Sequence, residues 1–220
     1  PSLDLRDPAR LAAQLHEAWG PVLGVTRAAS DAALAVGYTA VRRFDDALQA
    51  RGRAVLDEAR AGRGAVLVIA RPYHVDPGLS HHLGAELQAL GYPALSIRAL
   101  PRDPAWLSAL LADDLAAGRI ADPFDVRDLL PPCDNSGAAE RLWGARIAAR
   151  HGGLGVVDLS SFKCAQDAPT AAPIAALMAA SGTAYCALHD LDETRPRASL
   201  RLALRSLAHS LRARSLAPWT

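Results

Sequence analysis

Apolar and polar positions along this chain follow two patterns, one typical of helices and one typical of buried strands. Residues 28–61 lack proline, and their apolar positions recur at helical spacing with arginine and aspartate between them. This pattern predicts one long amphipathic helix, with a break expected near Gly52. Gly62 and Gly64 end the helix. The apolar run at 65–70 (AVLVIA) then has the length and the β-branched content of a strand covered on both faces.

The remainder of the chain alternates between helices and strands. Strands that alternate with helices predict an α/β fold with three layers, in which a mostly parallel sheet of about four strands is flanked by helices. The expected organisation is an N-terminal extension with a long helix at 1–64 and an α/β domain at 65–220. The further strands are expected at 94–97, 154–159 and 184–188. Helices are expected at 79–90, 173–180 and 196–211, and another begins near Pro104. A further helix is expected to be capped by Asn135 or Ser136 and to end at Gly152-Gly153.

Three of the four predicted strands end in polar or reactive sequences. The first is followed by RPYHVD at 71–76, the third by SSFKCAQD at 160–167, and the fourth by His189-Asp190. Parallel sheets bind ligands in the crevice at the carboxyl ends of their strands. We therefore expect these three segments to converge on one functional edge.

The segment RPYHVDP places a cation, an imidazole and a carboxylate in one short loop between two prolines. Arg71, or the helix N-terminus that follows, is a candidate to hold an anionic group, while His74 or Asp76 handles a proton. The alternative is that His74 and Asp76 only cap the next helix and satisfy the loop backbone. Arg71, His74 and Asp76 are the candidate cofactor-binding residues.

Cys164 lies in the turn SFKCAQDAP, between a buried strand and a helix. The neighbouring Lys163 and the helix N-terminus favour the thiolate, the form that attacks electrophiles or binds metals. The alternative is a small packed residue. As a nucleophile, Cys164 would need His74 or His189 as its base.

Composition excludes several classes of function. The net charge of +1 gives no footprint for nucleic acid or an anionic membrane, and no apolar run is long enough to span a bilayer. The three cysteines are widely spaced and form no CxxC pair, which favours a reducing, cytoplasmic environment. Neither of the nucleotide-binding motifs GxxxxGK[ST] and GxGxxG is present.

A chain that begins with proline is expected to be the C-terminal part of a longer protein.

Three segments together resemble one family. They are ARPYHVDPGLSHHLGAELQALGYPALSI, DNSGAAERLWGARIAARHGGLGVVDLSSFKCAQDAPT and SGTAYCALHDLDETRPRASLRLALRSLAHSL. They resemble the dehydratase-like region of the large acyl-CoA dehydratase activases, which are related to the 2-hydroxyglutaryl-CoA dehydratase system. The resemblance covers residues 65–211 and is less distinct over 1–64.

This resemblance implies a role in low-potential electron transfer towards coenzyme A thioester chemistry. Members of the family couple ATP hydrolysis in an actin-like ATPase module to electron delivery through iron–sulfur clusters. The implied cofactor is a cubane-type cluster, with Cys164 as its metal ligand and Cys133 and Cys186 outside the ligand set. The implied partners are the ATPase module, an upstream dehydratase-like region and an acyl-CoA substrate. The segment alone is expected to be non-catalytic.

The sequence departs from the family pattern in two respects. Ala165 stands where the family commonly has glycine after the cysteine. One cysteine also cannot hold a cubane cluster, which generally needs about four ligands, so the others are expected from outside this chain. The alternative is a docking scaffold of the same system that has lost its cluster. A third hypothesis is a cysteine- or histidine-dependent enzyme that acts on a small anion.

Overall fold

The computed structural model describes residues 7–161, 164–191 and 197–215, and the chain divides into two compact units at 1–48 and 49–220. The first unit contains helix α1 (Pro8–Leu23) and the larger part of helix α2 (Arg27–Glu58). The side chain of Asp7 caps α1 by accepting a hydrogen bond from the backbone N–H of Arg10. Helix α1 was not among the elements predicted from the sequence. The domain boundary expected after residue 64 stays a prediction.

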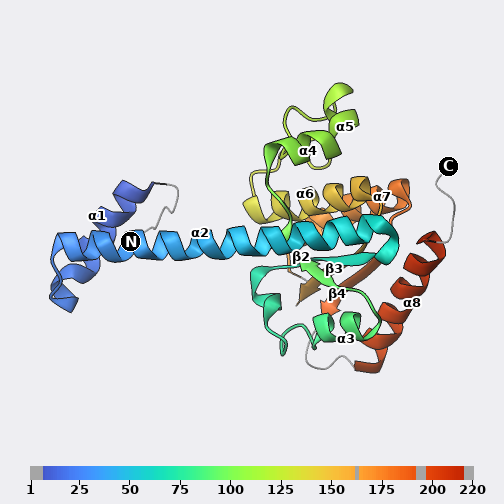
Figure 1. Ribbon diagram of the computed structural model, residues 1–220, viewed down its shortest axis with the longest axis horizontal. Helices are drawn as coiled ribbons and strands as arrows, with labels where there is room; N and C mark the ends of the chain where they lie inside the picture. Colours follow the sequence, from blue (N-terminus) through green and yellow to red (C-terminus); the bar gives the residue numbers. More distant parts are fainter. Residues whose placement is uncertain (1–6, 162–163, 192–196, 216–220) are drawn as a thin grey trace. The chain divides into compact units, whose positions relative to one another are not determined.

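The second unit contains a four-stranded, all-parallel sheet, which confirms the predicted fold class (Figure 1). The strand order is β2-β1-β3-β4, so the chain leaves β1 towards one side of the sheet and later places β3 on the other side. The point where the order reverses lies between β1 and β3, and ligands commonly bind at such a switch point. The strands are β1 (Ala65–Ile69), β2 (Ala94–Ser96), β3 (Leu154–Ser161) and β4 (Tyr185–Leu191).

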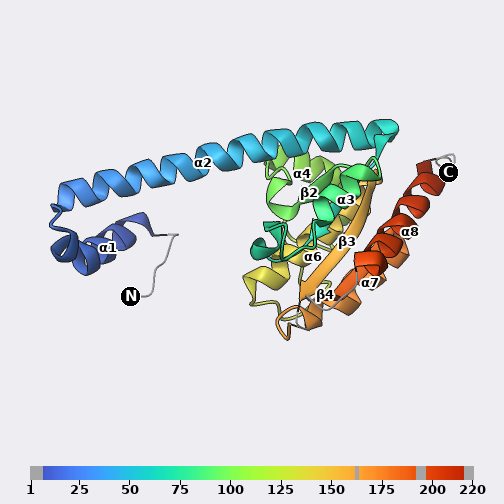
Figure 2. The ribbon, with the colours of Figure 1, turned by 90° about the horizontal axis from the view of Figure 1, so that it is seen from below.

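Helices cover both faces of this sheet (Figures 1 and 2). Helices α6 (Ser136–His151) and α7 (Ala168–Ser181) lie on one face, and α3 (Leu83–Ala89) and α8 (Arg197–Ser215) on the other. Every residue of β3 is buried. Alternate residues of a strand point to opposite faces, so β3 sends Val157 and Leu159 into the apolar cluster with α3 and α8, and Asp158 towards α6.

Two helices begin at positions other than those predicted. Helix α3 starts at Leu83 instead of residue 79, because His81 and His82 have left-handed backbone angles (φ of 50° and 59°) that interrupt a helix. Helix α7 starts at Ala168 and continues through Pro173, which was taken from the sequence as its beginning. The proline at an early helical position is instead Pro169.

Helix α2 runs without a break through Gly52, so the break expected there is wrong. Gly52 is buried, and a Cβ atom at this position would overlap the carbonyl oxygen of Ala99. The glycine therefore permits a close approach between the helix and the segment after β2. A π-helical turn at Ala59–Arg63 follows α2 and ends before β1.

The segment between β2 and α6 contains helices α4 (Pro104–Leu110) and α5 (Ala112–Ala116). Two arginines of α6 form ion pairs with this segment. Arg150 pairs with the buried carboxylate of Asp114, and its hydrogen bond lowers the pKa of Asp114 to about 2. Arg146 donates to the carboxylate of Asp128. Among the described helices, none is both long and apolar enough to cross a membrane.

Candidate functional site

The loops after β1 and β3 meet at the switch point through an ion pair. Arg71 Nε donates to Asp167 Oδ1 at 2.7 Å, and the side chain of Asp167 is 3% exposed. Burial acts to lower the pKa of Arg71, but the hydrogen bond and the charge of Asp167 outweigh this effect, so the pKa lies above its usual value. The expected convergence of these two strand ends is therefore observed.

His74 forms a second link, from the loop after β1 to the last residue of β3. Its Nδ1 accepts the backbone N–H of Arg71 at 3.2 Å, so we infer that Nε2 carries the proton and donates to Ser161 Oγ at 2.7 Å. Burial lowers the pKa of His74 below its usual value, which keeps the ring neutral. With both ring nitrogens engaged, His74 holds the loops together and has no lone pair available for a proton.

Asp76 has the local capping role that the sequence left as an alternative. Its Oδ1 accepts the backbone N–H groups of Gly78 at 2.8 Å and Leu79 at 3.0 Å, and the residue is exposed. The structure thus separates the three loop candidates. Arg71 bonds to Asp167 in the β3–α7 loop, His74 bonds to Ser161 at the end of β3, and Asp76 bonds within its own turn. A role in cofactor binding stays a prediction for all three.

A fully buried ion pair lies behind this edge. The guanidinium of Arg141, on α6, donates to Asp158 Oδ1, to the carbonyl oxygen of Leu159 at 3.2 Å and to Thr170 Oγ1 at 3.1 Å. Its Nη1 also lies 3.9 Å from Asp167 Oδ2. Two arginines and two aspartates therefore form one connected network, and their formal charges cancel.

The other oxygen of Asp158 connects this network to β4. Asp158 Oδ2 accepts a hydrogen bond from the hydroxyl of Tyr185 at 3.0 Å and lies 2.8 Å from His189 Nε2. Three side chains, from α6 and β4, thus lie within hydrogen-bond distance of the carboxylate of Asp158. Burial, together with the charge of Asp158, raises the pKa of Tyr185. His189 is held by Asp158 through one ring nitrogen while its side chain stays 37% exposed.

Cys164 is half-buried and faces a small cavity at the same edge. The cavity has a volume of about 210 Å³, and Cys164 and His189 both line it, together with Arg141, Ser160, Asp167, Ala168 and Ala171. Two backbone N–H groups, from Asp167 and Ala168, donate to the carbonyl oxygen of Cys164 and form the turn into α7. Lys163, which was expected to influence the thiol, lies outside the described residues.

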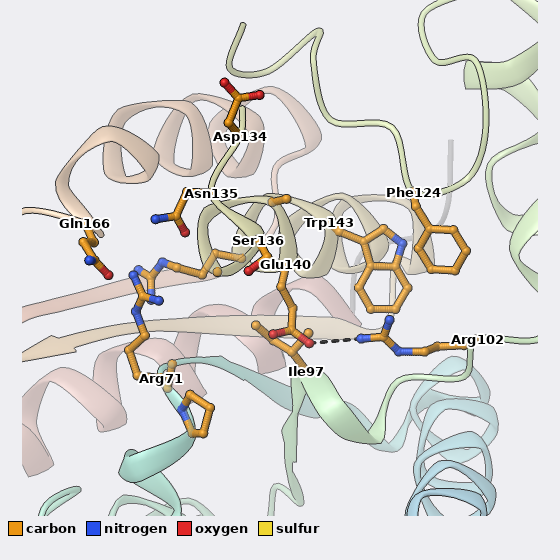
Figure 3. Close-up of a pocket in the computed structure, with 15 residues that line it drawn as sticks. Arg71, Ile97, Arg102, Phe124, Asp134, Asn135, Ser136, Glu140, Trp143 and Gln166 are labelled. Carbon is orange, nitrogen blue, oxygen red and sulfur yellow. Dashed lines mark hydrogen bonds and ion pairs between the residues drawn. The ribbon is translucent and has the colours of Figure 1, made fainter. Parts of the chain in front are cut away.

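A larger cavity of about 810 Å³ lies beside it, at the carboxyl ends of β1 and β2 and the start of α6. Figure 3 shows Arg71 and Gln166 at one end and Trp143 and Phe124 at the other. The rings of Phe124 and Trp143 stack at 5.5 Å between centroids, and the guanidinium of Arg102 lies 5.1 Å from the Trp143 centroid. Arg102 also pairs with Glu140 at 3.0 Å. One end of the cavity is therefore aromatic, and the other is lined by Arg71.

The residues present do not complete a cubane iron–sulfur site. Such a cluster generally needs about four ligands, and the chain has three cysteines. Cys186 packs against the apolar cluster on the α3 and α8 face of the sheet, whereas Cys164 faces a cavity beside α6 and α7. Among the described residues, no group of three or more histidine, cysteine, aspartate or glutamate side chains is placed to hold a metal ion. A cluster here would need ligands from elsewhere.

Sequence reasoning missed two members of the buried network, Asp158 and Arg141. Asp158 left one signal, a charged residue inside the apolar run LGVVDL, because a buried charge requires a partner. Arg141 lies beside the apolar positions of α6 and reads as an ordinary surface residue. Its partner is 17 positions away in sequence, and no local pattern identifies it.

Comparison with known proteins gives one match. Residues 1–100, less than half of the chain, match the family described as CoA enzyme activase uncharacterised domain (DUF2229). The match overlaps the resemblance noted from the sequence over residues 65–100 and extends it to the N-terminal part. No curated protein and no solved structure matches the chain. The N-terminal 100 residues are thus similar to a domain linked with CoA enzyme activase systems.

Proposed function

We propose that this chain is a component of a CoA enzyme activase system and supplies one ligand, Cys164, to an iron–sulfur cluster completed from outside residues 1–220. The position of Cys164 carries the proposal. The residue is half-buried at the carboxyl end of β3, next to the switch point, and it faces a cavity instead of the core. The family match supports the link to the activase system.

The incomplete donor set defines what the partner must contribute. Further thiolates would come from an upstream dehydratase-like region or from another subunit, and the cluster would lie in the crevice between the two parts. In this arrangement the chain holds one wall of the site, and an actin-like ATPase module delivers low-potential electrons to it. The reaction served would be chemistry on coenzyme A thioesters.

Anaerobic reconstitution with iron and sulfide tests the ligand role of Cys164. The natural full-length protein is purified together with its activase partner, and bound iron and the electron paramagnetic resonance spectrum of the reduced sample are measured. We expect Cys164→Ser to lower the bound iron or to change the spectrum, because serine is a poorer ligand for this iron than a thiolate.

Cys133→Ser is the matched control, since Cys133 is also half-buried but lies before α6 and outside the cavity at Cys164. It should retain both the iron and the spectrum. Equal iron content and identical spectra in wild type and Cys164→Ser would remove Cys164 from the ligand set.

The second candidate is a docking scaffold of the same system without a cluster. The observation that favours it is the incomplete donor set together with the buried network of Arg71, Asp167, Arg141 and Asp158, which holds the functional edge in one shape without a metal. A pull-down with the actin-like ATPase module as bait tests this candidate. Retention of a chain that binds no iron after reconstitution would favour the scaffold, and loss of retention would exclude it.

A further inference from the structure

The larger cavity, at the start of α6, has no role in the proposed function. Its volume of about 810 Å³ lies within the range of about 300–1,000 Å³ that is typical of small-molecule sites. It opens at the carboxyl ends of the strands, where parallel sheets bind ligands, and Cys164 is not among its lining residues. The two ends of the cavity differ in chemistry, and this difference defines what the cavity can bind (Figure 3).

At one end, Arg71 directs one corner of its guanidinium to the cavity. Nε and Nη2 both face Asp167 Oδ1, at 2.7 Å and 2.5 Å, so this edge of the group is occupied. No hydrogen bond joins Nη1 to a residue in the described part of the chain. Nη1 lies against Gly137, because a Cβ atom at position 137 would overlap it. The missing side chain at Gly137 therefore leaves room for this donor beside the start of α6.

At the other end, Phe124 offers an aromatic surface. Trp143 is 3% exposed and donates through Nε1 to the carbonyl oxygen of Pro123 at 3.1 Å, so its ring is held in place. Phe124 stacks on Trp143, with 5.5 Å between the ring centroids, yet Phe124 remains 45% exposed. The exposed part of this ring can pack against a second planar ring, either offset or edge to face.

Charges along the wall favour a ligand without a net charge. Arg102 pairs with Glu140 at 3.0 Å, and Asp167 compensates the charge of Arg71. Asp134 adds a further carboxylate to the lining. A negatively charged group would therefore meet carboxylates, whereas an uncharged carbonyl oxygen can accept a hydrogen bond from Nη1 without this repulsion. This differs from the anionic group that the sequence suggested for Arg71.

Spacing along α6 sets the length of the ligand. Gly137 lies at the Arg71 end and Trp143 at the aromatic end, and the six positions between them span about 9 Å of α-helix. We propose that this cavity binds an uncharged, elongated molecule with an aromatic ring at one end and a carbonyl acceptor at the other. The ring packs on Phe124, and the carbonyl oxygen accepts a hydrogen bond from Arg71 Nη1. This inference goes beyond the proposed function, because neither Cys164 nor a cluster takes part.

Phenylalkanamides of different chain length test the spacing. Ligand-observed NMR titrations measure their dissociation constants for the natural full-length protein, purified without iron reconstitution. We expect 5-phenylpentanamide, which matches the spacing when extended, to bind with a dissociation constant of about 1 mM or tighter. Phenylacetamide cannot reach both ends at once and should bind at least about fivefold more weakly, because one contact is lost.

Two ligands of the same length test the chemistry of each end. In 5-cyclohexylpentanamide a saturated ring replaces the planar one, and binding should weaken about threefold or more. In 5-phenylpentanoate a carboxylate replaces the amide, and binding should also be weaker, because of the carboxylates on the wall. Tighter binding of the pentanoate than of the amide would overturn the assignment of an uncharged ligand.

Three variants place the ligand in this cavity, each compared in protein that shows the wild-type circular dichroism spectrum. Phe124→Leu should weaken 5-phenylpentanamide binding by about three- to tenfold, since leucine keeps the apolar contact but has no ring. Gly137→Ala should weaken it by about fivefold, because the added methyl group displaces Nη1. Tyr73→Leu is the matched control and should not change it, since Tyr73 is also 45% exposed but does not line the cavity.

The inference is overturned if 5-phenylpentanamide shows no saturable binding, or if it binds no tighter than phenylacetamide. Equal affinities in wild type and Phe124→Leu would also overturn it. Iron has no part in these titrations, so their failure leaves the ligand role of Cys164 untouched. Loss of that role in the reconstitution experiment likewise leaves this inference standing.

Discussion

Arg141 and Asp158 form an ion pair in which the exposed fractions of the two side chains are 2% and 0%. The pair joins α6 to the central strand β3, close to the edge of the sheet at which Arg71, Asp167 and His189 lie. Removing one partner would leave the other charge buried without compensation, and this determines the first prediction.

Replacing Arg141 with methionine should lower the free energy of unfolding by about 3–5 kcal/mol, the cost typical of breaking a buried pair. Urea unfolding monitored by circular dichroism measures the change. Arg201→Met is the matched control, because Arg201 pairs with Glu86 while its side chain is 55% exposed. It should cost less than about 1 kcal/mol. Equal losses in the two variants would mean that burial does not govern the strength of these pairs.

The second prediction concerns two glycines of α2. Gly52→Ala should destabilise the fold by several kcal/mol, since its Cβ would overlap the carbonyl oxygen of Ala99, which is backbone and cannot move aside. Gly37→Ala introduces a Cβ into open space and should be neutral or stabilising by about 0.5–1 kcal/mol. Thermal melts of both variants provide the comparison. A destabilised Gly37→Ala with a stable Gly52→Ala would refute the packing explanation.

His151 should make the stability of the fold depend on pH. Burial, reinforced by the charge of Arg60, lowers the pKa of His151 to about 4 from a usual value of 6.5. The unfolded chain therefore binds more protons between these values, so the contribution is complete above pH 6.5 and is lost as the pH falls towards 4. The free energy of unfolding at pH 5 should be lower than at pH 7.5 by about 2 kcal/mol from this group.

The test is urea unfolding of wild type and His151→Gln at both values of pH. Glutamine cannot be protonated in this range, so the variant should lose less stability between pH 7.5 and pH 5 than wild type loses. The same difference in both proteins would show that another group is responsible.

The fourth prediction concerns the segment that supplies Phe124 to the larger cavity. Arg146 is 4% exposed and donates to the carbonyl oxygen of Asp125 at 2.8 Å as well as to Asp128. Arg146→Ala should release this segment and increase the rate of chymotrypsin cleavage after Phe124, because a protease needs locally opened chain.

Limited proteolysis followed by mass spectrometry gives the rates. Arg127→Ala is the control, since Arg127 is 70% exposed and pairs only with Asp125 among the contacts observed. It should change the rate less than twofold. A faster cleavage in Arg127→Ala than in Arg146→Ala would place the anchor of this segment elsewhere.

The four strands were predicted close to their observed positions, and the reason is local. The apolar runs at 65–70 and 154–159 are too short for a helix and rich in β-branched residues, so their length and composition suffice to identify buried strands. Asn135 or Ser136 was predicted in the same way as the cap of α6, and the structure selects Asn135, whose side chain accepts the backbone N–H of Ala138 three positions later. Helix starts failed where the backbone angles of His81 and His82 were decisive.

The role of Gly52 shows the limit of this approach. A glycine inside a helical pattern reads as a break, yet here it permits contact with Ala99, which is 47 positions further along the chain. The same limit applies to the candidate site. Arg71, His74 and Cys164 were identified because polar residues follow strands, but the partners Asp167, Ser161 and His189 depend on which strands are neighbours.

The sequence by itself determined the α/β class, the strands and the segments that form the functional edge, because each of these follows from spacing and residue type within a short window. Only the tertiary structure decided that β3 lies between β1 and β4, since strand order depends on packing across the whole sheet. That order places Asp158 between Arg141 and His189 and brings His189 to the cavity that Cys164 lines.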